Sequence, residues 1–395
     1  MNQNEKFISD LALLMTAGGV VLSDSFPVSE EKTNGVYNYV IIDKKVAVIT
    51  KFCGDHDVKN ITVPDEIDGY QVAAAGNDVF ADLYQLESVE LASGMIALGS
   101  RCFFQCCNLN MINLPDSLKY IGSEAFKSCE SLKQIVVPNE ILSIGKSLFE
   151  ECDSLKSVIL PDALKVICEK AFSGCSSLEQ ITIPEGVTSI KESAFQNCSS
   201  LNSITLPKKL DKIENSVFAF CSSLKSIALD DRIGRIGDYA FFGCSSVKNI
   251  KFSSKLHSIG SYAFALCSSL ENADIPVNVT VIHEKAFAQC SELKNIRLSE
   301  KLVAIENNAF NQCESISEVI VPGSVKVIGE QAFYKCTNLK NVTIHNGVET
   351  IEKRAFDECT AIKKLKLGDT ITSIGEQAFS IAKSVFRNDS PTLAI

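Results

Sequence analysis

A phenylalanine recurs every 23 residues along most of this 395-residue chain. The spacing holds without a slip over fourteen positions: Phe80, Phe103, Phe126, Phe149, Phe172, Phe195, Phe218, Phe241, Phe264, Phe287, Phe310, Phe333, Phe356 and Phe379. A fixed period of this length is typical of a solenoid, in which each period forms one coil and stacked coils share a core. The chain is therefore expected to extend coil by coil rather than to divide into ordinary globular domains.

Other columns define the expected coil. Apolar residues follow each column phenylalanine at fixed offsets, as in Leu178, Ile181, Ile183, Val187 and Ile190 after Phe172. The alternation at Ile181-Thr182-Ile183 predicts a short strand, and a proline often follows and ends it. A second short strand leads to Ala-Phe-x-x-Cys, which we expect to form one helical or 3₁₀ turn. The glycine after this second strand is replaced by Cys168 or Lys191 in other coils, so a positive φ is not required there.

Four parts are expected along the chain. Residues 1–35 comprise a linker and either an amphipathic helix, with Phe7, Leu11, Leu14 and Met15 on one face, or a signal-like segment. Residues 36–60 read as a β-hairpin that caps the exposed apolar end of the first coil. Residues 61–380 form the solenoid, and 381–395 form a C-terminal tail.

Twelve of the sixteen cysteines stand three residues after a column phenylalanine, from Cys106 to Cys359. Stacked coils would bring neighbouring thiols within reach of a disulfide. All twelve side chains should nevertheless point into a packed interior, where a free cysteine behaves as a small hydrophobic residue. We therefore expect a buried column of free thiols and a reducing or anaerobic setting, with disulfides and metal binding as the alternatives.

Composition excludes several function classes. The net charge is −10 and basic residues are not clustered, so nucleic-acid binding is not expected. No stretch approaches the ~20 apolar residues of a membrane span. The four histidines fall in different coils, and buried thiols are poor nucleophiles. The sequence thus predicts neither catalytic residues nor a metal or cofactor site, and the chain is not expected to be an enzyme.

The repeat A-F-x-x-C-x-x-L-x-x-I-x-L-P-x-x-L-x-x-I-G resembles the BspA-type, or Treponema-type, leucine-rich repeat. The first coil, I-T-V-P-D-E-I-D-G-Y-Q-V from Ile61 to Val72, is similar to the entry repeat of members from gut anaerobic bacteria. This resemblance implies a leucine-rich-repeat solenoid of the α/β repeat class, with short parallel strands on one side and helical or 3₁₀ turns on the other. It also implies a secreted or cell-surface protein that binds host proteins, matrix or other bacteria, without a shared ligand site.

Two features could serve binding. A column of lysines, such as Lys133 and Lys156, is interrupted by glutamates and reads as a solvated rim. A group of extra aromatic and apolar residues, in coils that also lack the strand-ending proline at Asp230 and Ser253, is the candidate binding site: Phe220, Tyr239, Phe242, Tyr262 and Leu266. The alternative is that these side chains add to packing.

The sequence therefore predicts a monomeric, non-enzymatic binding protein that recognises a protein or glycan in cell-surface adhesion or host–microbe contact. An intracellular scaffold or structural protein-interaction module is the alternative. The protein would be cytoplasmic if residues 1–25 remain as a helix.

Overall fold

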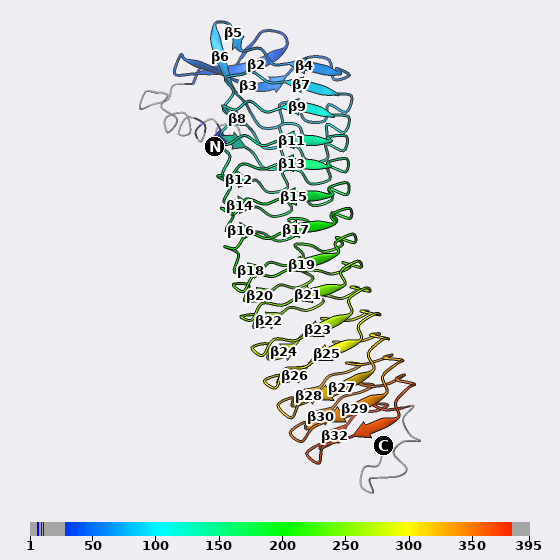
Figure 1. Ribbon diagram of the computed structural model, residues 1–395. Coiled ribbons are helices and arrows are strands. Elements are labelled where there is room, and N and C mark those ends of the chain that lie inside the picture. The colour runs from blue at the N-terminus through cyan, green and yellow to red at the C-terminus, as the bar shows by residue number, and fades with distance from the viewer. Residues whose placement is uncertain (1–5, 8, 10, 12–27, 381–395) are drawn as a thin grey trace. The chain divides into compact units, whose positions relative to one another are not determined.

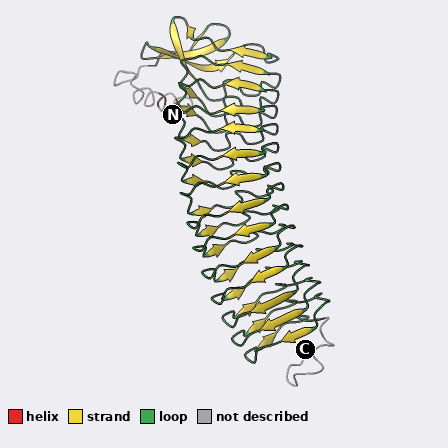
Figure 2. Ribbon diagram, viewed as in Figure 1, coloured by secondary structure: helices red, strands yellow, loops and turns green. Residues whose placement is uncertain are grey.

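The computed structural model describes Lys6, Phe7, Ser9, Leu11 and residues 28–380. The expected C-terminal tail at 381–395, and Leu14 and Met15 of the expected amphipathic helix, lie outside the described residues. The chain divides into two compact units, Met1–Cys198 and Ser199–Ile395. Both are built from short strands joined by loops and turns (Figures 1 and 2).

The first unit begins with an antiparallel hairpin of β2 (Tyr37–Ile42) and β3 (Val46–Phe52), with β1 (Lys32–Thr33) on the outer edge of β2. The rings of Tyr37 and Phe52 pack on Phe80, at centroid distances of 6.5 and 5.8 Å. The hairpin thus covers the first column ring, where a preceding coil would otherwise be needed. This hairpin lies within residues 36–60, where the sequence predicts a cap.

The first coil contains an additional turn. Strand β5 (Glu66–Ile67) pairs antiparallel with β6 (Tyr70–Ala75), which continues the sheet from β3. Asp68 and Gly69, which connect them, have φ of 51° and 79°. Positive φ at both central residues is the requirement of a type I′ hairpin turn, which Asp-Gly meets well.

The coils of the first unit carry two columns of short parallel strands. The first column holds β4 (Asn60–Thr62), β7 (Ser88–Glu90), β9 (Met111–Asn113), β11 (Gln134–Val136), β13 (Ser157–Ile159) and β15 (Gln180–Thr182). The second follows β6 with β8 (Ala97–Leu98), β10 (Tyr120–Ile121), β12 (Ser143–Ile144), β14 (Val166–Ile167) and β16 (Ser189–Ile190). Paired residues are 23 apart, as in Ser143, Val166 and Ser189, except between β4 and β7, where the longer first coil makes the separation 28, as from Asn60 to Ser88.

The second unit repeats the same coil. Its first column holds β17 (Ser203–Thr205), β19 (Ser226–Ala228), β21 (Asn249–Lys251), β23 (Asn272–Asp274), β25 (Asn295–Arg297), β27 (Glu318–Val321), β29 (Asn341–Ile344) and β31 (Lys364–Lys366). Its second column holds β18 (Lys212–Ile213), β20 (Arg235–Ile236), β22 (Ser258–Ile259), β24 (Val281–Ile282), β26 (Ala304–Ile305), β28 (Val327–Ile328), β30 (Thr350–Ile351) and β32 (Ser373–Ile374). The predicted solenoid with two short strands per coil is confirmed.

The column phenylalanines form a ring stack in each unit. From Phe80 to Phe195, neighbouring rings have centroids 5.1–5.7 Å apart. From Phe218 to Phe379 the distances are 5.0–5.5 Å. These rings are fully buried. Each interior ring therefore contacts the ring before it and the ring after it, which makes the column the centre of the shared core.

The segment around each column phenylalanine differs from prediction. The expected helical or 3₁₀ turn is replaced, throughout the described coils, by consecutive turns that we call the turn arc. Residues two before and two after the phenylalanine have a positive φ, for example Lys170 at 54° and Gly174 at 81° around Phe172. This geometry directs alternate amides at the next coil, so the Lys170, Phe172 and Gly174 amides donate to the carbonyls of Glu192, Ala194 and Gln196. A helical turn would direct these amides along its own axis instead.

The cysteine column is buried, as predicted, with exposures of 0–2%. Each thiol for which a bond is resolved donates to the carbonyl of the column phenylalanine in the preceding coil, at Sγ–O distances of 3.0–3.4 Å. Burial raises the pKa of Cys106 and of Cys267 to about 12. These thiols therefore tie successive coils together through their hydrogen bonds.

The glycine after the second strand has no positive φ, as expected, at Gly99, Gly122 or Gly145. Gly122 lets the backbones of two neighbouring coils lie close together, because an added Cβ would lie 2.3 Å from the Ser100 amide nitrogen. At Gly145 the nearest atom would be 3.6 Å away, which is ordinary contact. The same repeat position is therefore sterically restricted in one coil and open in the next.

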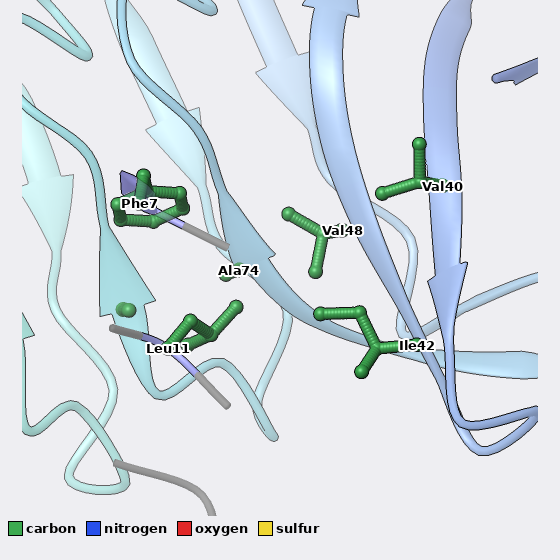
Figure 3. Close-up of a cluster of buried hydrophobic side chains, with 7 residues drawn as sticks. Phe7, Leu11, Val40, Ile42, Val48 and Ala74 are labelled. Atoms are coloured by element: carbon green, nitrogen blue, oxygen red, sulfur yellow. The ribbon is translucent and has the colours of Figure 1, made fainter. Parts of the chain in front are cut away.

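Two described residues near the N-terminus, Phe7 and Leu11, pack on the first sheet. Lys6, Phe7, Ser9 and Leu11 have helical backbone, and Phe7 and Leu11 are buried against the sheet of β2, β3, β6 and β8 (Figure 3). Their partners are Val40, Ile42, Val48, Ala74 and Ala97. The predicted apolar face is thus in contact with the sheet at these two residues.

Candidate functional site

The five candidate residues lie on three successive turn arcs of the second unit. Phe220 follows β18, Tyr239 and Phe242 follow β20, and Tyr262 and Leu266 follow β22. Phe220 and Tyr239 are 44% and 39% exposed, whereas the other three are half-buried. We call these five residues the aromatic patch. The expectation that they are partly exposed agrees with the structure.

Four of the five side chains contact one another directly. Tyr239 stacks on Tyr262 with a centroid distance of 4.6 Å and an interplanar angle of 14°. Phe242 meets Phe220, Tyr239 and Tyr262 edge to face, at 5.1, 5.6 and 6.4 Å. Phe242 is therefore the centre of the patch, and offset or edge-on contacts of this kind stabilise aromatic clusters by ~0.5–1.5 kcal/mol per pair.

The backbone at the patch is unusual for the residues it carries. Phe220, Tyr239, Tyr262 and Leu266 have φ values of 56–62°. Bulky side chains are uncommon in this left-handed region, which costs roughly 1–2 kcal/mol for an L-residue other than glycine. The equivalent arc positions of the other described coils hold polar residues or glycine. Four large apolar side chains thus occupy positions that disfavour them, all within three neighbouring coils.

A glycine makes room for one of the rings. Gly243 occupies the arc position between those of Phe220 and Leu266, and its φ is +71°. A Cβ at Gly243 would lie 2.9 Å from Cδ1 of Phe220. The Phe220 ring therefore lies over the backbone of the following coil. The sequence could have indicated this contact, because Gly243 stands 23 residues after Phe220, at the same position of the next arc.

Two charged residues complete one edge of the patch. The Lys285 ammonium donates to the Tyr262 hydroxyl at 2.8 Å and lies 3.6 Å from the Glu284 carboxylate. The Tyr262 hydroxyl lies 3.4 Å from Glu284. The hydrogen bond to Tyr262 raises the pKa of Lys285, and partial burial raises the pKa of Tyr239. Sequence reasoning missed Lys285, although it follows Tyr239 and Tyr262 in the same column.

The missing prolines do not alter the coil. In most coils a proline carbonyl accepts a bond from the amide three residues later, as from Leu210 to Pro207. The Asp230 and Ser253 carbonyls accept the same bond from Ile233 and Leu256. Their side chains also accept from the amide two residues on, which is a local turn typical of Asp and Ser. The turn therefore keeps its backbone hydrogen bond at Asp230 and Ser253, and the loss of proline does not mark the candidate site.

Exposed apolar residues also occur on the strands of the first unit. Val136 and Ile159, exposed by 59% and 62%, are register partners on β11 and β13. Both are β-branched, which favours strands irrespective of any partner. Their exposure follows from strand alternation, and their backbone is ordinary. They are therefore weaker candidates than the patch.

The described residues contain no cluster of histidine, cysteine, aspartate and glutamate suited to a metal ion. Over the same residues, no helix is long and apolar enough to cross a bilayer. Among the histidines, His283 contacts Glu306 at 3.2 Å on the surface. What the patch offers chemically is a partly exposed apolar surface with one ion pair at its edge.

Comparison with known proteins places the chain in a family. The BspA type Leucine rich repeat region matches residues 49–179, 165–290 and 257–385. None of the curated proteins matches this chain. Among solved structures, a leucine-rich repeat protein from Bacteroides ovatus is similar, with 25% identity over 92% of this chain and 93% of that chain and a TM-score of 0.71.

A leucine rich cell surface protein from Faecalibacterium prausnitzii is 27% identical over 80% of this chain and 95% of that chain, with a TM-score of 0.52. The pneumococcal vaccine antigen PcpA, 18% identical over 90% of this chain and 96% of that one, shares the fold at a TM-score of 0.52. The 23-residue repeat, the two strand columns and these similar structures all indicate a leucine-rich-repeat solenoid. This chain belongs to the BspA-type leucine-rich-repeat family.

Proposed function

We propose that this chain is a non-enzymatic binding protein that recognises a macromolecular partner through the aromatic patch, in adhesion or host–microbe contact at a bacterial surface. Leucine-rich-repeat proteins are binding scaffolds in general. The observation that carries the proposal is the set of four bulky apolar residues at left-handed positions. Every described arc has this backbone, so the patch is distinguished by the bulky side chains that it carries there, and aromatic residues are enriched where partners bind.

The packing alternative explains the patch less well. The core beneath it is complete, since Phe218, Phe241 and Phe264 are buried and stacked as in other coils. Other arcs carry serine, asparagine, glutamine or lysine at the same positions with the same backbone. An added aromatic layer is therefore not required for a coil to form, and aromatic residues are enriched where partners bind.

The surface location is supported by the Faecalibacterium relative, which is described as a cell surface protein. Protease treatment of intact cells tests this part of the proposal. The chain should be degraded before a cytosolic marker is. Protection of the chain until the cells are lysed would instead support the intracellular scaffold.

The binding role is tested by comparing the wild-type chain with a variant carrying Tyr239→Ser, Phe242→Ser and Tyr262→Ser. Both are used as bait against immobilised matrix proteins, mucins and a glycan array. The proposal predicts ligands that the wild type retains and the variant loses. The control is Tyr334→Asn, which removes an arc tyrosine outside the patch that bonds Glu358 at 2.6 Å. Equal retention by wild type and patch variant would contradict the proposal.

A further inference from the structure

A row of exposed cations lies at the corner between the two strand columns of the second unit. Lys209, Arg232 and Lys255 stand one period apart, each as the second residue of the turn that leads from one column to the other. The same backbone bond closes this turn in all three coils, as from Leu210 to Pro207. The three side chains therefore leave the corner from equivalent positions in successive coils.

Two more cations begin the strands that follow this corner. Lys212 on β18 and Arg235 on β20 are register partners, and both are exposed. Because β18 and β20 are neighbours in the second strand column (Figure 1), the two side chains project from the same outer face, with backbones about 4.8 Å apart. We call these five residues the basic corner: Lys209, Lys212, Arg232, Arg235 and Lys255.

The coil does not require a cation at either of these repeat positions. The flanking coils carry Gly186 and Asn278 at the corner position, and Ser189 and Ser258 at the strand position. The chain as a whole has a net charge of −10, so the basic corner is a local exception. No basic run marks it in the sequence, because its members come from three successive periods and only the stacking of the coils brings them together.

The protein itself neutralises few of these charges. Among the described residues, Lys212 forms an ion pair with Glu214 at 2.8 Å, and the other four members of the basic corner form none. Carboxylates of the same coils are turned to the backbone: those of Asp230 and Asp231 accept amide hydrogen bonds at 3.1 and 3.3 Å. The exposed Asp211 has a short side chain. The long lysine and arginine side chains are therefore the outermost charged groups.

Stacking cations in this way opposes folding. Like charges directly opposite each other on neighbouring strands are destabilising, and Lys212 and Arg235 form such a pair. The corner cations repeat at the coil spacing, since the column rings that follow them, Phe218, Phe241 and Phe264, are 5.5 and 5.2 Å apart. An anion bound across several cations would relieve this repulsion, so the arrangement is better explained by an anionic ligand than by the stability of the coil.

The geometry favours one kind of anion. The cations are exposed and individually weak, so binding requires several contacts at once along a polymer. In an extended acidic peptide, side chains on the same side recur at about 6.8 Å, twice the rise per residue, which exceeds the coil spacing. A chain of pyranose rings instead advances by a length similar to one coil for each sugar. Guanidinium groups such as those of Arg232 and Arg235 pair well with carboxylates and sulfates.

We infer that the basic corner binds an acidic polysaccharide, whose carboxylate or sulfate groups pair with the cations while the sugar chain lies across the stacked coils. The basic corner shares no residue with the aromatic patch, so this inference does not rest on the proposed function. Because the contact is made by exposed charges, binding should weaken as the salt concentration rises.

Polygalacturonate and heparin, one carboxylated and one sulfated, serve as probes, with neutral dextran as the blank. The wild-type chain should bind at least one of the two acidic polysaccharides and not dextran. A corner variant with Lys209→Gln, Arg232→Gln, Arg235→Gln and Lys255→Gln should bind the same polysaccharide at least ~tenfold more weakly, because four exposed ion pairs are lost together. Failure of the wild type to bind either polysaccharide would overturn the inference.

The matched control removes the same amount of charge elsewhere. It carries Lys133→Gln, Lys156→Gln, Lys301→Gln and Lys363→Gln, all at exposed positions outside the basic corner, and should bind as the wild type does. Equal weakening in the control and the corner variant would show an effect of net charge alone and would overturn the inference.

Three further measurements complete the test. The thermal unfolding midpoint of the corner variant should equal or exceed that of the wild type, since repulsion is removed; a clearly lower midpoint would show that the cations are structural and would overturn the inference. Tighter binding of polyglutamate or duplex DNA than of both polysaccharides would also overturn it. The Tyr239→Ser, Phe242→Ser, Tyr262→Ser variant should bind the polysaccharide normally. Loss of binding there would assign the polysaccharide to the aromatic patch, which overturns this inference and leaves the proposed function standing.

Discussion

At the scale of single residues, the fold is defined by backbone geometry that side-chain identity does not reveal. Lys170 and Arg354 adopt positive φ in the turn arc, although neither residue type favours that region. The requirement comes from the alternate amides that bond the next coil. This explains why sequence reasoning predicted a helical turn for the arc: asparagine and glycine, the usual signals of a left-handed residue, are absent from many of these positions.

The glycine after the second strand gives a paired test of close approach. Gly122→Ala should lower the free energy of unfolding by ~1–3 kcal/mol, because the added Cβ would lie 2.3 Å from the backbone of the preceding coil. Gly145→Ala, at the same repeat position in the next coil, has 3.6 Å of clearance. It should change stability by less than ~0.5 kcal/mol. Urea unfolding measures both free energies. Equal losses in the two variants would contradict the difference in clearance between the two coils.

Gly243→Ala tests the support of the patch. An alanine would adopt a φ of +71°, and its Cβ would meet the Phe220 ring at 2.9 Å. We expect a loss of ~1–2 kcal/mol in urea unfolding together with weaker retention of the ligands that the wild type binds. The matched control is Gly94→Ala, which has no positive φ and no atom within 4 Å of the added Cβ. A loss of binding in the control as well would show that the effect is not local.

At the scale of the repeated element, the cysteine column was predicted from spacing, but its bond was not. Sequence offsets showed that the side chains point inward, and burial followed. The offsets could not show that each thiol donates to the carbonyl of the preceding column phenylalanine, because this bond depends on how the turn arcs stack. The same limit applies to the patch: column alignment identified the five residues, whereas the Tyr239–Tyr262 stack and the role of Lys285 required coordinates.

The raised thiol pKa values predict loss of stability in alkali. The folded-state pKa of Cys267 is about 12, above its ordinary value of 9.0. The stabilisation is therefore complete below pH 9 and is lost as pH rises towards 12, since the unfolded thiol ionises first. Each such thiol contributes a slope of ~1.4 kcal/mol per pH unit in this window.

A variant with Cys244→Ala, Cys267→Ala and Cys290→Ala should have a shallower slope by ~4 kcal/mol per pH unit. The measurement is the free energy of unfolding at several pH values above 9, under reducing conditions. The dependence of the free energy of unfolding on pH is the quantity to compare. The absolute free energy is not, because alanine also leaves a cavity that lowers stability at every pH. An unchanged slope would mean that the column thiols ionise in the folded protein.

At the scale of the whole molecule, the repeat period was sufficient to predict the solenoid, its two strand columns and the need for a cap. The period could do so because every coil buries the same positions against its neighbours. It carries no information about a partner, since the partner contacts positions where the coils differ. The functional reading of the patch therefore depends on departures from the repeat, and the proline losses at Asp230 and Ser253 show that a departure in sequence can leave the backbone unchanged.

Position along the column should determine the cost of removing a ring. Phe310 stacks on Phe287 and Phe333, at 5.5 and 5.1 Å, whereas Phe379 stacks on Phe356 as the last column ring. Phe310→Ala should cost ~3–5 kcal/mol, and Phe379→Ala clearly less, because a terminal coil contributes one interface instead of two. Thermal unfolding midpoints compare the two. Equal midpoints would contradict nearest-neighbour stabilisation of the array.

The central claim is that the aromatic patch exists for binding and not for packing. The most direct test is the free energy of unfolding of a variant in which Phe220, Tyr239 and Tyr262 are each replaced by asparagine, a residue that accepts positive φ. We predict a change of less than ~1 kcal/mol, because relief of backbone strain offsets the lost aromatic contacts. A loss of ~4 kcal/mol or more, as expected for large side chains removed from a core, would show that the rings are packing residues and would contradict the account.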